Sequence, residues 1–235
     1  MTAAKRFKEK LRHRQPLAVI NADYPSSGLV EFLGHPELGL DAVMLDTEQG
    51  NLEAERIEDM ARAARLVDLC VLVRVFSPDP WVIERMMLRG VDGIIVPRLD
   101  TAEQAQVVLD TVKYLFPNDL DSKIIIIQIE SQAAHEDLEQ FLDLKGIDVY
   151  FVGPVDLSRS MGHKGNYQTP AVRDAINNIF DQVNDANATA GTLVKPGEVN
   201  EWLERGARFL YFHVNDWLKL GANEFPFAVD VKRHL

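Results

Sequence analysis

Residues 123–158 read KIIIIQIESQAAHEDLEQFLDLKGIDVYFVGPVDLS and predict a strand, a helix and a second strand. The first strand opens with isoleucines at positions 124–127, and such an apolar, β-branched run is typical of a strand buried on both faces. A helix is expected over residues 133–144, and a second apolar run, VYFVG, ends at Gly153-Pro154. Two buried strands joined by a helix form the repeating unit of a parallel sheet.

Carboxylates follow both strands of this unit. Gln128 and Glu130 are two residues apart, so strand alternation points both side chains to one side, and Asp156 lies just beyond the second strand. Neighbouring parallel strands lie roughly 4.8 Å apart, which lets the two carboxylates converge on one cation. Oxygen ligands without a His or Cys partner suit a hard divalent ion such as Mg or Mn. A structural interpretation also fits, with Glu130 at a helix N-terminus and Asp156 as an N-cap.

The rest of the chain repeats the alternation of strand and helix. Further strands are expected at residues 17–21, 41–46, 71–75, 93–97, 190–194 and 209–213, and further helices at 3–12, 28–33, 51–67, 79–89, 101–116, 171–187, 198–205 and from 217. This pattern predicts an α/β fold, a (β/α)8 TIM barrel, with residues 1–235 as a single domain. An open doubly wound sheet is the competing architecture, but no glycine-rich fingerprint follows the first strand.

Polar residues stand at the carboxyl ends of most expected strands, which in a barrel meet at the mouth where active sites lie. Arg74 interrupts an apolar strand, and a buried unpaired cation is costly, so we expect an anionic partner or ligand beside it. The residues expected at the mouth are Asn21, Asp46, Glu48, Arg74, Gln128, Glu130, Asp156, Lys195 and His213.

Composition argues against several classes of protein. The formal net charge is −11, which argues against a nucleic-acid footprint. The single cysteine, Cys70, lies in an apolar run and is expected in the core, so neither a disulfide framework nor a zinc site is expected. The amino terminus lacks the apolar segment of a signal peptide, and no apolar run approaches the roughly 18 residues of a membrane span. We therefore expect a cytoplasmic protein with neither membrane nor nucleic-acid partners.

With its residues in this order, the chain resembles the HpcH/HpaI family, the class II pyruvate-dependent aldolases of the phosphoenolpyruvate/pyruvate barrel superfamily. The matching segments are MLDTEQ (44–49), LVRV (72–75), RGVDGIIVPRLDTAEQA (89–105), IIQIES (126–131) and FVGPVDLSRSMG (151–162). The resemblance implies a (β/α)8 barrel that cleaves or forms a bond between a pyruvate enolate and an aldehyde. It also implies a homo-oligomer built from dimers, such as a hexamer, whose last helix is often exchanged between subunits.

The resemblance further implies a divalent metal cofactor, Mg, Mn or Co, held by Glu130 and Asp156. Arg74 would bind a 2-oxo acid such as pyruvate or oxaloacetate and stabilise its enolate, because a guanidinium offers a planar fork to carboxylate and enolate oxygens. The remaining substrate-binding residues would be Gln128, Gly153, Pro154 and Asp156.

Two departures from the family pattern bear on catalysis. The family usually has Glu-His where this chain has Glu48-Gln49, and that histidine, paired with the aspartate corresponding to Asp46, handles the proton. Glutamine does not titrate, so a metal-bound water, Glu48 or another group such as His213 is left to move the proton. The second departure is the short segment 114–123, where many relatives carry a glycine- and arginine-rich loop. The predicted catalytic positions are Arg74, Asp46, Glu48 and Gln49.

Two other functions compete with a metal-dependent lyase or synthase. Lys195 ends a strand, and a lysine of lowered pKa can form a Schiff base with a keto acid. Gln49 instead suits a barrel that binds metal and keto acid without ordinary aldol cleavage, or one that serves a specialised biosynthetic condensation. His163 and His213 are interpreted as hydrogen-bonded structural or surface histidines.

Overall fold

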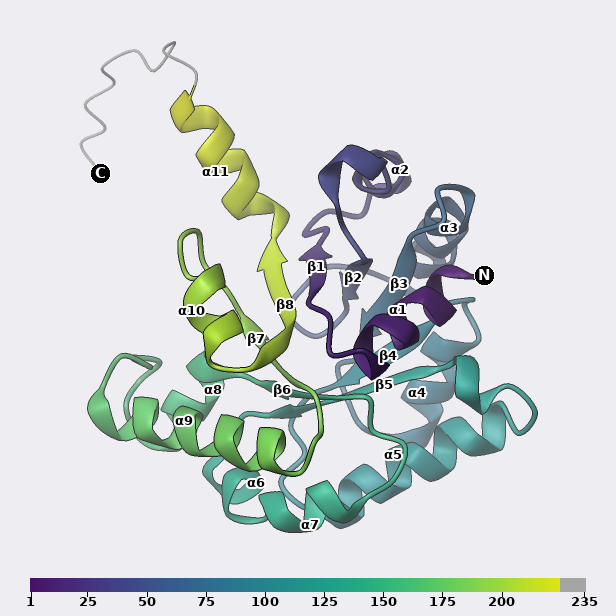
Figure 1. The fold of residues 1–235 in the computed structure, drawn as a ribbon. Coiled ribbons are helices and arrows are strands. Elements are labelled where there is room, and N and C mark those ends of the chain that lie inside the picture. The colour runs from purple at the N-terminus through teal and green to yellow at the C-terminus, as the bar shows by residue number, and fades with distance from the viewer. Residues whose placement is uncertain (225–235) are drawn as a thin grey trace.

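The computed structural model describes residues 1–224 and shows a closed barrel of parallel strands in chain order (Figure 1). The strands are β1 (Leu17–Asn21), β2 (Ala42–Asp46), β3 (Cys70–Arg74), β4 (Gly93–Val96), β5 (Ile124–Ile129), β6 (Val149–Val152), β7 (Ala190–Leu193) and β8 (Ala207–His213). β8 pairs with β1 from Leu17 to Asn21, which closes the sheet. The predicted (β/α)8 barrel is confirmed.

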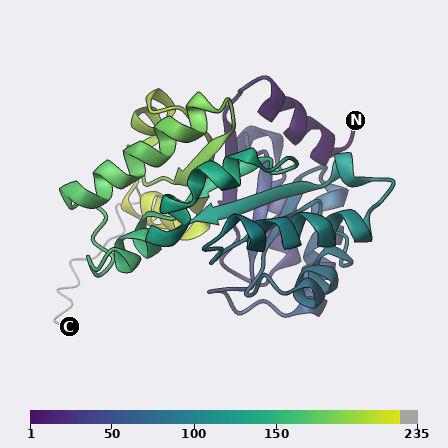
Figure 2. The same ribbon diagram turned by 90° about the horizontal axis from the view of Figure 1, so that it is seen from below.

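Helices lie around the outside of the strands (Figures 1 and 2). They are α1 (Ala3–Arg12), α2 (Ser27–Leu33), α3 (Ala54–Leu66), α4 (Pro80–Met87), α5 (Ala102–Leu115), α6 (Gln132–Glu136), α7 (Leu138–Asp143), α8 (Pro154–Ser160), α9 (Pro170–Asp185), α10 (Val199–Glu204) and α11 (Val214–Glu224), with short 3-10 helices η1 (Pro36–Leu38) and η2 (Leu120–Ser122). α11 extends away from the barrel beyond the end of β8 (Figure 1). Within the described part of the chain, no helix combines the length and the apolar character needed to cross a membrane.

Strand alternation divides the hydrophobic core into two layers. On β5, Ile125, Ile127 and Ile129 pack in the layer between sheet and helices, whereas Ile124 and Ile126 pack inside the barrel. Each face of this strand is therefore covered by apolar side chains. That double burial explains why the isoleucine run has no polar interruption.

Helix α1 closes the inner layer at the amino-terminal end of the strands. Phe7 of α1 packs edge-on against Phe209 of β8, with 6.3 Å between ring centroids. Cys70 of β3 is fully buried in the same layer, as predicted. This end of the barrel is thus filled with apolar side chains, and the polar residues gather at the opposite end.

The inward-facing rows of the strands stay apolar until their last residue. On β2 the row runs Ala42, Met44, Asp46, and only the last of these carries a charge. Because all strands are parallel, the last residues of these rows meet at one rim. The polar residues that end such rows are Asn21, Asp46, Arg74, Gln128 and His213.

Two local expectations are wrong. The single helix expected over 133–144 is two helices, α6 and α7, separated at Asp137, whose side chain accepts a hydrogen bond from the N–H of Ala102 (2.7 Å). No helix is expected between the strand that ends at Gly153-Pro154 and the helix over 171–187, but α8 begins at Pro154 directly after β6. Proline at the first helical position favours this early start. The predicted domain also includes residues 225–235, which lie outside the described residues.

Candidate active site

A cavity of about 170 Å³ opens at the carboxyl-terminal rim of the barrel. The residues predicted for the site that line it are Gln49, Arg74, Gln128, Glu130, Gly153, Pro154 and Asp156. They come from the ends of β3, β5 and β6, from α8 and from the segment after β2. The structure therefore brings most of the predicted site to one place.

Glu130 is buried just after β5 and accepts two hydrogen bonds. Its Oε1 accepts from the backbone N–H of Arg98 (2.8 Å), and its Oε2 accepts from Nε2 of Gln128 (2.6 Å). Burial raises the pKa of Glu130 to about 7, and the nearby carboxylates of Glu48 and Asp156 act in the same direction. Among the described residues, Oε1 of Gln128 is buried and has no hydrogen-bond partner. Glu130 and Gln128 thus line the cavity together, and Gln128 carries a buried amide oxygen without a partner.

Gly153 makes room for this carboxylate. A Cβ at position 153 would lie 2.8 Å from Cβ of Glu130 and 2.9 Å from its Oε2, so any side chain there would displace Glu130. The N–H of Gly153 donates to the carbonyl of Ile129 (3.1 Å). The N–H of Gly153 is therefore occupied and Pro154 has none, so the substrate binding expected of these two residues stays a prediction.

Asp156 reaches the same cavity from the first turn of α8. Its Oδ1 lies 2.7 Å from Nη1 of Arg159, one turn later, and both side chains are partly exposed. Such exposed pairs contribute little stability, so Asp156 remains accessible to another cation. Among the residues that the structure describes, no three side chains of His, Cys, Asp or Glu cluster as ligands for one metal ion. Glu130 and Asp156 are therefore a two-carboxylate set, and a hard cation would complete its shell with substrate or solvent oxygens.

Arg74 faces the cavity and has the anionic partner that its burial requires. Its Nε and Nη2 donate to the two oxygens of Asp46 at 2.9 and 2.6 Å. Burial lowers the pKa of Arg74, but the bonds from Asp46 more than offset this and keep the guanidinium charged. Asp46 therefore holds the guanidinium of Arg74 in place. A direct catalytic role for Asp46 stays a prediction.

Glu48 lies between two arginines. Its Oε1 accepts from Nε of Arg98 (2.8 Å), and its Oε2 lies 3.4 Å from Nε of Arg74. Arg98 has a φ of +58°, a left-handed conformation that costs energy for a residue with a side chain. In this conformation the backbone N–H of Arg98 donates to Glu130 while its side chain holds Glu48. Arg98 therefore contacts both Glu48, a predicted catalytic residue, and Glu130, a predicted metal ligand.

The chain matches the sequence profile of a known protein family. The profile described as HpcH/HpaI aldolase/citrate lyase matches residues 34–214, well over half of the sequence. The chain belongs to this family. The family generally depends on a divalent metal, and its named members include aldolases and lyases. The resemblance that the sequence motifs indicate is thereby confirmed.

HpcH/HpaI relatives match almost the whole chain. The hydroxypyruvate/pyruvate aldolase of Roseobacter denitrificans is 26% identical over 228 residues, covering 87% of this chain and 88% of that protein. The 4-hydroxy-2-oxo-heptane-1,7-dioate aldolase of Shigella flexneri is 27% identical over 228 residues, covering 87% and 85%. A crystal structure of an HpcH/HpaI aldolase/citrate lyase family protein from Burkholderia cenocepacia J2315 has a TM-score of 0.84 at 22% identity, covering 92% of this chain and 96% of that one.

Several residues at this HpcH/HpaI site are not indicated by the sequence. Tyr211 lines the cavity from within the apolar run FLYFH, and its spacing from Phe209 and His213 on the inward row of β8 was the available signal. Asp23 follows β1 and binds His213, with 2.7 Å between Oδ1 and Nδ1. His213 is hydrogen-bonded, as expected, but it also lines the cavity. The sequence does not indicate Arg98, because its contacts with Glu48 and Glu130 depend on its left-handed backbone conformation.

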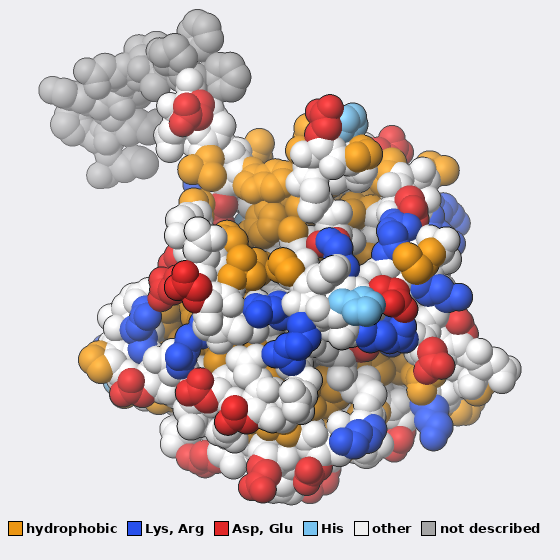
Figure 3. Space-filling model, in the orientation of Figure 1, with side chains coloured by type: hydrophobic (Ala, Val, Ile, Leu, Met, Phe, Trp, Pro, Cys, Tyr) orange, Lys and Arg blue, Asp and Glu red, His pale blue; other side chains and the backbone are white. Residues whose placement is uncertain are grey.

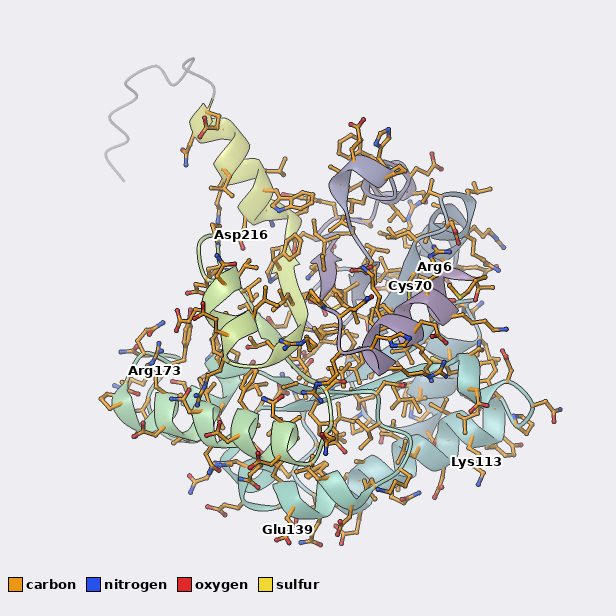
Figure 4. All side chains as sticks on the ribbon, in the orientation of Figure 1. Arg6, Cys70, Lys113, Glu139, Arg173 and Asp216 are labelled. Carbon is orange, nitrogen blue, oxygen red and sulfur yellow. The ribbon has the colours of Figure 1, made fainter. Side chains whose placement is uncertain are left out.

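Lys195 was predicted to lie at the mouth, but its side chain binds a residue of α11. Its Nζ lies 3.2 Å from Oδ2 of Asp216 on α11, which Figure 4 labels near the base of that helix. Lys195 is not one of the described residues that line the cavity. The geometry therefore gives a Schiff-base mechanism no support in this HpcH/HpaI protein.

Proposed function

We propose that this chain is a divalent-metal-dependent carbon–carbon lyase or synthase that acts on a 2-oxo acid, such as pyruvate or oxaloacetate, through its enolate. The observation that carries the proposal is the convergence of Glu130, Asp156 and Arg74 on one cavity at the barrel rim. Two carboxylates suit a hard cation, and a guanidinium suits an anionic substrate. The aldolase relatives support the same class of reaction.

Arg74 would bind the carboxylate and enolate oxygens of the substrate. Asp46 takes two of the five guanidinium N–H groups, which leaves three that are not donated to it. Because Asp46 fixes the plane of the guanidinium, the positive charge is in place before negative charge develops on the substrate. The same enolate arises in aldol cleavage, in condensation and in decarboxylation of oxaloacetate, so Arg74 serves each of these reactions.

The donor set fits a divalent cation. Glu130 and Asp156 would hold it, and when bound it would polarise the keto oxygen of the substrate as a Lewis acid. Burial raises the pKa of Glu130, and a bound cation would offset this cost of keeping the carboxylate ionised. The unpaired Oε1 of Gln128 would accept a hydrogen bond from a further ligand in the same cavity.

The test is metal-dependent release of pyruvate. The protein is incubated with several 4-hydroxy-2-oxo acids and with oxaloacetate, in the presence of Mg, Mn or Co. We expect pyruvate release that EDTA abolishes and that Glu130→Gln and Arg74→Met reduce by at least about a hundredfold. The matched control is Glu139→Gln, which changes an exposed acid on α7 (Figure 4). No pyruvate release from any substrate, together with no binding of pyruvate or oxaloacetate, would reject the proposal.

We also propose a homo-oligomer in which α11 packs on another subunit. Leu218 and Leu220 of α11 and Phe32 of α2 are exposed, and Figure 3 shows hydrophobic side chains gathered on the face between these two helices. An apolar face of this kind favours burial against a partner. Light scattering should give a dimer or hexamer mass, and Leu218→Glu should lower it; a monomer at micromolar concentration would contradict the assembly. Cytoplasmic location stays a prediction.

A further inference from the structure

A chain of hydrogen bonds between the ends of β1 and β8 has no part in the proposed metal or enolate binding. Nδ2 of Asn21 donates to Oη of Tyr211 (2.9 Å), Oη lies 3.2 Å from Nε2 of His213, and Nδ1 of His213 lies 2.7 Å from Oδ1 of Asp23. Asn21 and Tyr211 are buried, and the Asp23 side chain is 12% exposed. Tyr211 and His213 line the same cavity as Glu130.

The backbone determines where the protons of this chain lie. The N–H of Asp23 donates to Oδ1 of Asn21 (2.9 Å), so the NH2 group of Asn21 faces Tyr211. Oη of Tyr211 therefore accepts from Asn21. The carboxylate of Asp23 can only accept, so Nδ1 of His213 carries a proton and donates to Asp23. In the neutral imidazole Nε2 is then the unprotonated nitrogen, and it accepts the proton of Tyr211. The imidazole thus directs its basic nitrogen at a phenol that borders the cavity.

Asp23 is held in a costly backbone conformation for this contact. Its φ is +57°, in the left-handed region that residues other than glycine rarely adopt. Two groups fix it: Asn21 accepts its N–H, and its Oδ2 accepts from the backbone N–H of Asn215 (3.2 Å). Strain of this kind persists where the surroundings determine it and is concentrated at functional sites.

We propose, on the basis of the proposed function, that Tyr211, His213 and Asp23 form a proton relay that replaces the imidazole absent at Gln49. In cleavage, Oη of Tyr211 takes the proton of the substrate hydroxyl as its own proton passes to Nε2 of His213. The carbon–carbon bond breaks, its electron pair enters the enolate beside Arg74, and the aldehyde leaves. The same proton returns through Tyr211 to the enolate carbon, which forms the methyl group of pyruvate and restores the neutral relay.

Each member of the relay has a distinct task. Burial raises the pKa of Tyr211 well above its usual range, although the charge of Arg74 acts against this, so a phenolate alone is unfavourable. Passing the proton on to His213 avoids that phenolate, and Asp23 stabilises the resulting imidazolium. Tyr211 is the catalytic residue that meets the substrate, and Asp23 positions His213. The charged groups on neighbouring elements are Asp46, Arg74, Lys195 and Asp216.

Two reactions of the metal-loaded protein test the relay. Aldol cleavage requires a proton to leave a hydroxyl, whereas decarboxylation of oxaloacetate reaches the enolate by loss of carbon dioxide. Tyr211→Phe and His213→Asn should each lower kcat for aldol cleavage by about a hundredfold or more. KM and the rate of carbon dioxide release from oxaloacetate, which precedes protonation of the enolate, should stay within about threefold. His135→Asn is the matched control, because His135 binds Asn178 at an exposed position on α6.

Asp23→Asn supplies a readout that a purely structural role would not change. Loss of the carboxylate destabilises the imidazolium, so the acidic limb of the pH profile for aldol cleavage should move to lower pH while kcat falls about tenfold. Unchanged aldol cleavage in Tyr211→Phe and His213→Asn would overturn the relay and leave the proposed function intact. Equal loss of both reactions in these variants would also overturn it, by showing a structural role. Inactivity of the unmodified protein in both reactions would instead reject the proposed function.

Discussion

Arg74 and Asp46 form a two-point ion pair across neighbouring strand ends, with donor–acceptor distances of 2.9 and 2.6 Å. Both side chains are largely buried, with 11% and 7% exposure. Asp46 also accepts the backbone N–H of Glu48 (3.0 Å), so the carboxylate is fixed from two sides. Burial alone would raise the pKa of Asp46, but its bonds to Arg74 hold that pKa below the usual value. The guanidinium is thus kept charged and in one orientation.

Asp46→Ala should lower both stability and activity. The free energy of unfolding should fall by roughly 3 kcal/mol, because the buried guanidinium loses its main partner. The kcat/KM for pyruvate release should fall at least about tenfold, because Arg74 is no longer oriented. Urea denaturation and steady-state kinetics measure the two effects. Glu201→Ala, which removes the exposed partner of Arg173, is the control and should change stability by less than about 0.5 kcal/mol.

The stabilisation from Asp46 should depend on pH in a defined direction. Its pKa is lower in the folded protein than in the unfolded chain, so its contribution is complete above the unfolded value of about 3.9 and is lost as pH falls through the lower, folded value. The stability difference between the unmodified protein and Asp46→Asn should therefore be constant near neutral pH and shrink below about pH 4. Denaturation curves across this range measure it. A difference that grows on acidification would contradict the assigned pKa shift.

Gly153→Ala should damage the site more than the fold. The added methyl group would lie under 3 Å from the Glu130 side chain, which must then leave its bonds to Gln128 and Arg98. We expect kcat/KM to fall at least about tenfold and stability to fall by about 1–3 kcal/mol. The control is Gly28→Ala in α2, where the nearest atom to the new Cβ is 3.9 Å away. Activity of Gly153→Ala equal to that of Gly28→Ala would show that the position of Glu130 is unimportant.

The barrel, and the site residues that end its strands, can be predicted from strand periodicity. Charged or amide residues that end apolar rows, such as Arg74 and Gln128, must lie at one rim once the strands are parallel, and the structure places them there. Asp156 lines the cavity just beyond β6, but in the first turn of α8 and not at its N-cap, because Pro154 already starts the helix. The resulting pair with Arg159 depends on that helix and was not predicted.

The site residues that the sequence does not indicate depend on backbone conformation and on contacts between distant segments. Asp23 and Arg98 act through left-handed backbone conformations, and neither is a glycine that would signal them. The bond between Asp23 and His213 joins residues 190 positions apart. Only closure of the barrel by β8 against β1 brings them together, with Asn21 opposite His213 in the register. Strand periodicity predicts such closure but does not identify which side chains bind across it.

Arg159→Gln should strengthen binding of a divalent cation. The guanidinium lies 2.7 Å from Asp156 and repels a second cation, while the pair itself contributes at most about 1 kcal/mol because both side chains are partly exposed. We therefore expect up to about a fivefold lower Kd for Mn, measured by isothermal titration calorimetry. Arg173→Gln, outside the site, is the control. Weaker Mn binding by Arg159→Gln would indicate that Asp156 is not a metal ligand.

Gln49→His should restore aldol cleavage to a protein whose relay has been removed. Gln49 lines the cavity, and its backbone N–H is bonded to Asp46 (3.3 Å), so an imidazole at this position would enter the same space. In the His213→Asn background, we expect Gln49→His to recover at least about tenfold of the lost kcat, because a titratable base again reaches the substrate. Gln49→Asn in the same background tests for a mere change of shape and should recover nothing. The contrary outcome is that neither double variant gains aldol cleavage while both still decarboxylate oxaloacetate. A histidine at position 49 then cannot substitute for His213, and proton transfer requires the residues of β8 that line the cavity.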